Sequence, residues 1–415
     1  MPPKKNRKFL SISLAILLFG VAVYFALPMF YSKVEYSYST IPTNTEIPQD
    51  DKSKDAVPTI DTSTPYIDVP VTHIKTPEAV KAIYLSAWVA GNPKYRNPLI
   101  KMIDETEPNA VVIDVKDSTG RISYQTGSKE INATGSTENR ISNIRALTNT
   151  LHQKNIYVIG RVSVFQDPYM TKLKPEWAIT RISDGNVWKD KKGLSFLDPS
   201  NKEVWKYIVS IAQDAYDQGF DEINFDYIRY PSDGDMKNIN YRLATGMTRA
   251  DNIEKFFIYL AEEMKKDENI PISADLFGLT TEVNNDMGIG QVWEKALPHF
   301  DFLSPMVYPS HYPPGSSGYK NPALYPYEIV SKALASAVKK TNAVQGQSIA
   351  KIRPWLQDFD LGATYTKEMV RAQMKATYDN GLDSWMLWDP SNKYTASALL
   401  PTTDANGIDA SSNQQ

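Results

Sequence analysis

Cysteine is absent from this chain of 415 residues, which excludes thiol nucleophiles, disulfides and cysteine-ligated zinc. Histidine is scarce, and no two of the four histidines have a metal-ligand spacing: His73, His152, His299 and His311. A metal site is therefore not expected, and neither is the metal chemistry of a polysaccharide deacetylase. Nothing in the sequence indicates a cofactor.

An excess of positive charge is also lacking, because 45 Lys and Arg face 48 Asp and Glu, for a net charge of -3. Nucleic-acid binding would require a basic face, so no nucleic-acid partner is expected. The chain contains no Gly-x-Ser-x-Gly elbow of the lipase type. Aromatic residues, by contrast, are abundant, with 24 Tyr and 8 Trp. Many stand near predicted strand ends, as in carbohydrate sites, although aromatic rings also fill cores.

Residues 9–30 form a nearly continuous apolar run, long enough to cross a bilayer of about 30 Å. Basic residues precede this run: Lys4, Lys5, Arg7 and Lys8. The positive-inside rule then predicts a membrane anchor (1–31 with its basic stub) and places the rest of the chain outside the cytoplasm. The alternative is a cleaved signal peptide and a secreted protein, but no small-residue cleavage box follows the run.

The composition shifts to Ser, Thr, Pro and Asp over residues 32–76, which predicts a flexible stalk. Residues 402–415 are equally polar and predict a disordered tail. Residues 77–401 remain for the folded domain.

Short apolar strands alternate with amphipathic helices across this domain. The predicted strands are 82–88, 110–115, 156–163, 222–228, 271–277, 302–307, 352–357 and 384–388. Predicted helices include 138–153, 200–218, 249–266, 326–340 and 366–380, with Ser200 and Glu203 in a capping-box pattern. Eight such units predict an α/β fold, a (β/α)8 TIM barrel. A doubly wound sheet is the alternative, but no glycine-rich phosphate loop follows the first strand.

The segment 221–231 is the most informative part of the sequence. Ile223, Phe225 and Tyr227 alternate with Glu222, Asn224 and Asp226, as expected of a strand. The strand ends in a carboxylate, an aromatic residue and Arg229. Because barrels display catalytic groups at the C-terminal ends of their strands, Asp226 is the first catalytic candidate.

Other polar and aromatic residues stand at the remaining strand ends, which converge on one face of a barrel. A single Asp after a strand is usually a turn former or a helix cap, and Asp389 fits that description. Five of eight ends carrying carboxylates nevertheless indicate a site. The candidates for substrate binding are Trp88, Asp114, Asp117, Arg161, Tyr227, Arg229, Tyr308, Trp355, Asp358, Trp388 and Asp389.

Glycoside hydrolysis requires two carboxyl groups, one protonated as the acid and one acting as nucleophile or base. Asp226 is assigned as nucleophile or base, because Arg229 and Tyr227 stand close by in sequence. Asp275 has apolar neighbours, which suit an acid with a raised pKa. Arg161 is interpreted as a substrate ligand or a support for Asp226. Trp88, Tyr308, Trp355 and Trp388 are the candidate stacking platforms for sugar rings.

Five segments resemble the bacterial family described as "putative glycoside hydrolase domain": 82–86, 112–117, 225–231 (Phe-Asp-Tyr-Ile-Arg-Tyr-Pro), 304–309 (Ser-Pro-Met-Val-Tyr-Pro) and 385–389. The resemblance implies a TIM barrel with a carbohydrate role, and it carries over the position of Asp226. A more distant likeness links 221–228 to the fourth strand of chitinase-type barrels. Ile228 stands where those enzymes carry their catalytic Glu, which argues against substrate-assisted chitinase chemistry.

These observations predict a membrane-anchored glycoside hydrolase that acts on a polysaccharide outside the cytoplasm. The alternative is a carbohydrate-binding barrel that does not cleave, serving as a cell-wall scaffold.

Overall fold

The computed structural model describes residues 70–266 and 268–402. The predicted anchor, residues 9–30, and nearly all of the predicted stalk and tail lie outside these ranges. None of the helices within them is both long enough and apolar enough to span a membrane.

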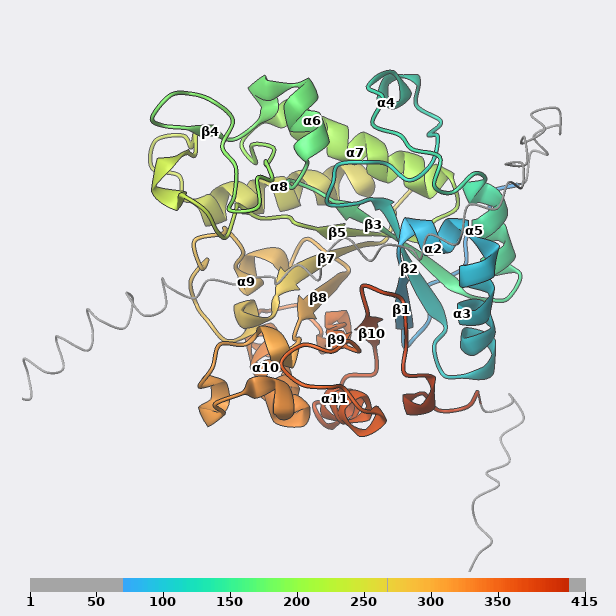
Figure 1. Cartoon of the computed structure of the whole chain (residues 1–415). Coiled ribbons are helices and arrows are strands. Elements are labelled where there is room, and N and C mark those ends of the chain that lie inside the picture. Colours follow the sequence, from blue (N-terminus) through green and yellow to red (C-terminus); the bar gives the residue numbers. More distant parts are fainter. Residues whose placement is uncertain (1–69, 267, 403–415) are drawn as a thin grey trace, which may run out of the picture. The chain divides into compact units, whose positions relative to one another are not determined.

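Eight parallel strands close into a barrel in the spatial order β1-β10-β9-β8-β7-β5-β3-β2, which confirms the predicted TIM-like fold. Figure 1 shows the helices arranged around the strands. The strands are β1 (Lys81–Leu85), β2 (Ala110–Lys116), β3 (Tyr157–Ser163), β5 (Glu222–Asp226), β7 (Ile272–Phe277), β8 (Phe302–Met306), β9 (Trp355–Gln357) and β10 (Trp385–Trp388). All eight coincide with predicted strands, differing only at their ends.

The α-helices are α2 (Ala87–Gly91), α3 (Pro93–Glu105), α4 (Lys129–Ala133), α5 (Ile144–His152), α6 (Pro168–Leu173), α7 (Lys202–Asp217), α8 (Arg249–Met264), α9 (Trp293–Ala296), α10 (Pro326–Ala343) and α11 (Lys367–Asp379). Their apolar faces pack against the outward-facing strand residues, among them Ile223 and Phe225, in one large core. Two short strands in the loops, β4 (Thr180–Arg181) and β6 (Ile239–Asn240), pair antiparallel. They join the long insertion after β3 to the one after β5.

Three predicted boundaries were wrong for local reasons. Strand β1 ends at Leu85 and not at Trp88, because Ser86 caps α2 by accepting a hydrogen bond from Val89 N. Helix α5 begins only at Ile144, after its cap Asn143. Asn201, rather than Ser200, caps α7, since the Ser200 hydroxyl donates to Asp198 instead.

The interior of the barrel is unusually polar along β5. Glu222, Asn224 and Asp226 all point inward, as the alternation of this strand requires. At the lowest level, Glu222 forms an ion pair with Arg353, and both side chains are fully buried. Tyr157 and Ser273 also donate to Glu222. This pairing compensates a carboxylate that would otherwise be costly to bury.

Residues 70–76, the last part of the predicted stalk, lie against the N-terminal ends of the strands. Ile74 N donates to Asp221 Oδ1 at 2.8 Å, and His152 Nε2 lies 3.0 Å from Asp221 Oδ2. Val158 N donates to the same Oδ2, and Thr76 contacts the Tyr157 hydroxyl. Asp221 therefore fastens this segment to the end of the barrel opposite Asp226.

The substitution Asp221→Asn should lower the free energy of unfolding by about 1.5–3 kcal/mol at pH 7, because a charged acceptor of several buried donors is lost. Burial alone would raise the pKa of Asp221, but His152, His73 and Val158 N hold it below its ordinary value. Its contribution is then present above about pH 4 and lost as the pH falls further. Urea unfolding at several pH values measures both effects.

The matched control is Asp383→Asn. The pattern Tyr-Asp-x-Gly-x-Asp occurs at 216–221, before β5, and again at 378–383, before β10, so Asp383 corresponds to Asp221 but is exposed. It should change stability by less than about 0.5 kcal/mol. Equal losses in the two variants would show that Asp221 does not fasten residues 70–76.

Candidate active site

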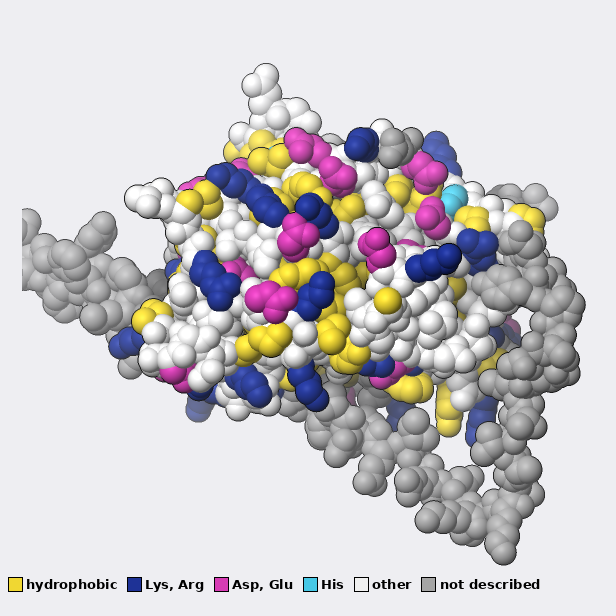
Figure 2. All heavy atoms as spheres, turned by 90° about the horizontal axis from the view of Figure 1, so that it is seen from above, with side chains coloured by type: hydrophobic (Ala, Val, Ile, Leu, Met, Phe, Trp, Pro, Cys, Tyr) yellow, Lys and Arg dark blue, Asp and Glu magenta, His cyan; other side chains and the backbone are white. Residues whose placement is uncertain are grey.

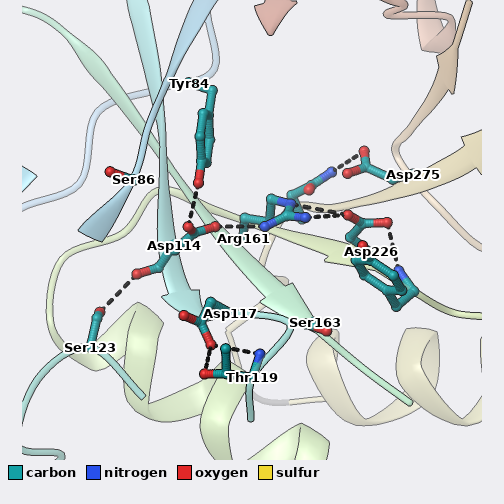
Figure 3. A network of polar contacts seen from close by, with 12 residues as sticks. Tyr84, Ser86, Asp114, Asp117, Thr119, Ser123, Arg161, Ser163, Asp226 and Asp275 are labelled. Carbon is teal, nitrogen blue, oxygen red and sulfur yellow. Dashed lines mark hydrogen bonds and ion pairs between the residues drawn. The ribbon is translucent and has the colours of Figure 1, made fainter. Parts of the chain in front are cut away.

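Four neighbouring strands bring charged side chains together at the C-terminal end of the barrel. Asp114 comes from β2, Arg161 from β3, Asp226 from β5 and Asp275 from β7. Asp114 pairs in register with Arg161, and Asp226 pairs with Ser163 on the same strand as Arg161. Figure 3 shows the guanidinium of Arg161 between the carboxyl groups of Asp114 and Asp226.

Arg161 holds both carboxylates through direct hydrogen bonds. Its Nη1 donates to Asp114 Oδ1 at 2.7 Å, while Nη2 and Nε donate to Asp226 Oδ2 at 2.5 and 3.1 Å. Burial alone would lower the pKa of Arg161, but Asp226 and Asp114 raise it well above its ordinary value. The guanidinium therefore stays charged and fixes the two carboxylates relative to each other.

Asp226 receives a third hydrogen bond, from the Tyr227 N–H to its Oδ1 at 2.6 Å. Tyr227 has a φ of 52°, a left-handed conformation that is uncommon outside glycine. Strain of this kind clusters at functional sites, because the surrounding structure must hold it. Three donors therefore bind the two oxygens of Asp226.

Asp275 is also buried, with 1% of its surface exposed, but its donors are uncharged. Asn224 Nδ2 and Trp355 Nε1 donate to Oδ1 at 2.9 and 2.7 Å. Burial, followed by the negative charge of Asp226, raises the pKa of Asp275 to about 8, although Arg161 opposes the shift. This environment favours the protonated form of Asp275, and Oδ2, which accepts neither of these hydrogen bonds, is the oxygen that can hold the proton.

An aromatic wall stands beside Asp114. The Tyr84 hydroxyl donates to Asp114 Oδ2 at 2.6 Å, and its ring stacks on Trp388 at 4.0 Å between centroids. Trp388 also lies 5.1 Å from the guanidinium of Arg161. Burial raises the pKa of Asp114 against the opposing influence of Arg161 and Tyr84.

Two of the predicted binding residues are buried more deeply than a stacking platform requires. Trp355 is 1% exposed and acts here as a hydrogen-bond donor to Asp275. Tyr308 is also buried, with its ring against His311 and Phe359. Neither ring offers an open face to a sugar in this structure.

Arg229, expected to support Asp226, points elsewhere. Its guanidinium lies over the rings of Tyr227 and Phe277, and its Nη1 donates to the Tyr230 carbonyl. Arg161, from the neighbouring strand, provides the contact with Asp226 instead.

Asp358 and Asp389 lie after β9 and β10, on the other side of the barrel. Asp358 accepts hydrogen bonds from the N–H and hydroxyl of Thr395, and Asp389 accepts one from Ser391 N in a turn. Burial raises the pKa of each to about 6. Thr395 and Ser391 belong to the loop after β10, so both carboxyl groups fix loop segments that border the site.

Trp88 and Asp117 lie on the β1–β2 side, where Arg140 joins them. The Arg140 guanidinium pairs with Asp117 and lies 5.1 Å from the Trp88 ring.

Sequence reasoning missed Tyr84 and Asn224, which bind the carboxyl groups of Asp114 and Asp275. Asn224 could have been found, because it shares the inward face of β5 with Asp226. Tyr84 likewise stands one residue before the end of β1. Asp167, which forms a fully buried ion pair with Lys116 at 3.0 Å, carried no such signal.

Comparisons with known proteins identify the family and the fold. The model of the family described as "Putative glycosyl hydrolase domain" matches residues 82–394. A search of the curated proteins finds no match. A hypothetical protein from Ruminiclostridium thermocellum ATCC 27405, solved by crystallography, is 34% identical, with a TM-score of 0.43. That match covers 46% of this chain and 96% of the other.

Two glycoside hydrolases share the fold at low identity. The glycoside hydrolase domain of PgaB (BpsB) from Bordetella bronchiseptica is 14% identical, with a TM-score of 0.56, covering 75% of this chain and 94% of that one. Alpha-L-fucosidase isoenzyme 2 from Paenibacillus thiaminolyticus is 10% identical, with a TM-score of 0.51, covering 77% and 48%. The family model spans most of the barrel, and the chain therefore belongs to the "Putative glycosyl hydrolase domain" family.

Proposed function

We propose that this protein cleaves a polysaccharide by carboxylate chemistry, with Asp275 as the general acid and Asp226 as the nucleophile or base. The observation that carries the proposal is the contrast between the two groups. Both are buried, but Asp226 is bound by a guanidinium, whereas Asp275 is bound by uncharged donors and has its pKa raised to about 8. A carboxyl group with a raised pKa suits the acid role, which leaves the role of base or nucleophile to Asp226.

In the proposed reaction, the proton on Asp275 Oδ2 passes to the glycosidic oxygen as the bond to the anomeric carbon breaks. Asp226 either attacks that carbon or removes a proton from the water that attacks it. In the first case water later cleaves the glycosyl ester, and Asp275 takes the proton from that water. The stereochemistry of the released sugar distinguishes the two routes.

A polymer outside the cytoplasm is the proposed substrate. The apolar run 9–30 and the basic residues before it support an anchor that leaves the barrel outside. Figure 2 shows acidic and basic side chains interspersed on the face seen there, with hydrophobic side chains between them. A surface of mixed charge supports an uncharged carbohydrate more than a strongly charged polymer.

A carbohydrate-binding barrel without cleavage is the second candidate, and one observation favours it. Ile228, in the place of the chitinase acid, is fully buried among core residues, so that position contributes nothing to catalysis. The Asp226–Arg161 pair could then serve to shape a binding site.

The full chain should hydrolyse at least one member of a panel of cell-wall polysaccharides and exopolysaccharides, measured as released reducing ends. Asp226→Asn should lower the rate about 10²- to 10⁴-fold, because the base or nucleophile is removed. Asp221→Asn is the matched control, since this buried carboxylate lies at the opposite end of the barrel and should keep its activity below its unfolding temperature.

Undiminished cleavage by Asp226→Asn would refute the assignment of Asp226. Binding of a polysaccharide without cleavage by the unaltered protein would favour the second candidate.

The value of kcat/KM should fall as the pH rises through about 8, because the free enzyme then loses the proton of Asp275. The substitution Asp275→Asn should lower the rate strongly and remove this decline. A pH–rate profile of both proteins, on the polysaccharide identified above, measures the effect.

Stability provides a test that does not depend on the substrate. A carboxyl group whose pKa is raised on folding binds more protons in the folded state, so stability should fall as the pH rises from about 4 to 8. The slope should approach about 1.4 kcal/mol per pH unit at most, and it should be reduced in Asp275→Asn. Parallel curves for the two proteins would contradict the raised pKa.

A further inference from the structure

Trp88 is the only exposed residue among the eight tryptophans, all of which lie in the described part of the chain. It stands on α2, directly after β1, with 60% of its surface exposed. Single exposed apolar residues are common on protein surfaces. Trp88, however, has neighbouring residues that hold its ring in position.

A close backbone approach positions Arg140 beside Trp88. A Cβ added at Gly91, the last residue of α2, would lie 1.9 Å from the Arg140 carbonyl oxygen, so only glycine allows α2 to pack there. Arg140 N donates to the Ser123 carbonyl, which fixes the approaching segment. The guanidinium of Arg140 then lies 5.1 Å from the Trp88 ring centre, within cation–π range.

The Arg140 side chain is only 6% exposed, unusual for a charged group on a surface loop. Its Nη1 pairs with Asp117 Oδ2 at 2.5 Å, and its Nη2 and Nε pair with Glu138 Oε2 at 2.6 and 2.7 Å. Arg121 also pairs with Glu138, at 2.9 Å. Two arginines thus face two carboxylates, and the support behind Trp88 is rigid and carries no net charge.

This cluster is continuous with the candidate active site. Asp117 follows Asp114 by three residues, and the Ser123 hydroxyl donates to the Asp114 carbonyl at 2.7 Å. Ser86, the cap of α2, follows Tyr84 by two residues at the end of β1. Trp88 therefore stands on the rim of the site, on the side away from Asp275.

We propose that Trp88, supported by Arg140, is a distal subsite that stacks an uncharged sugar ring of the polymer, remote from the bond that is cleaved. The proposal rests on the carbohydrate substrate proposed above. An aromatic ring backed by a guanidinium on a rigid support presents an apolar surface at low entropic cost, which suits the C–H face of a pyranose ring. The balanced charge nearby gives no attraction to an anionic sugar.

The test measures binding by the full chain in the Asp226→Asn background, so that the sugars are not consumed. The probes are cello-, xylo-, malto- and chito-oligosaccharides of increasing length, followed by calorimetry. Affinity should increase with the length of the oligosaccharide until the bound sugar is long enough to reach Trp88. Trp88→Ala should remove this gain, lowering affinity for the longest oligosaccharides roughly 2- to 10-fold and leaving the shortest unaffected.

Two further variants separate stacking from a structural effect. Trp88→Phe keeps an aromatic face and should restore part of the gain. Tyr95→Ala removes another exposed aromatic ring, 43% exposed on α3, and should change nothing. The effect of Trp88→Ala should also be the same at low and high salt, because the cluster has no net charge.

Equal affinity of Trp88→Ala and its parent for every length would overturn the proposal, and so would equal weakening for short and long sugars. These outcomes are separate from the fate of the hydrolase assignment. Length-dependent binding that requires Trp88, in a protein that never cleaves, would support the subsite and reject the hydrolase. Cleavage at the same rate by Trp88→Ala and its parent, for every length, would support the hydrolase and reject the subsite.

Discussion

The buried guanidinium of Arg161 is the interaction on which the site depends. Three carboxyl groups, those of Asp114, Asp226 and Asp275, are buried at one end of the barrel, and Arg161 is the cation that touches two of them. One positive charge cannot compensate three negative ones in a medium of low polarity. Asp275, which lacks direct contact with the guanidinium, is therefore the group that retains its proton. The proposed division into acid and base rests on this imbalance of charge and on the position of Asp275 on β7, next to β5 in the barrel.

At the lower level of the barrel, the buried carboxylate and its cation are equal in number. Glu222 has its own arginine, Arg353, together with donors from Tyr157 and Ser273. The charge of that carboxylate is matched by one cation. Asn224 lies between the two levels and donates to both Ser273 and Asp275. The inward face of β5 thus carries Glu222, which has an arginine of its own, then Asn224, and then Asp226, which shares Arg161 with Asp114.

The sequence was sufficient to predict the barrel, because each strand has a short apolar run that can be recognised without knowing which strands it pairs with. Asp226 could also be found, since a carboxylate at the end of an alternating strand is a local pattern. Its partner could not be found this way. Arg229 is three residues away in sequence but points to Tyr227 and Phe277, whereas Arg161 is 65 residues away and adjacent in space. Trp355 illustrates the same limit, because only the closed barrel, in which β8 separates β9 from β7, brings its N–H to Asp275 and reveals a donor rather than a platform.

The hydrogen bonds also restrict what Asp226 can do. Oδ2 is occupied by two donors of Arg161, while Oδ1 accepts only the N–H of Tyr227. In the proposed reaction, Oδ1 of Asp226 and Oδ2 of Asp275 are therefore the oxygens that take part. Donors that stabilise the charge of a carboxylate lower its nucleophilicity and its basicity together. The choice between attack on carbon and proton removal from water therefore rests on the separation of the two carboxyl groups, which sets the stereochemistry of the released sugar.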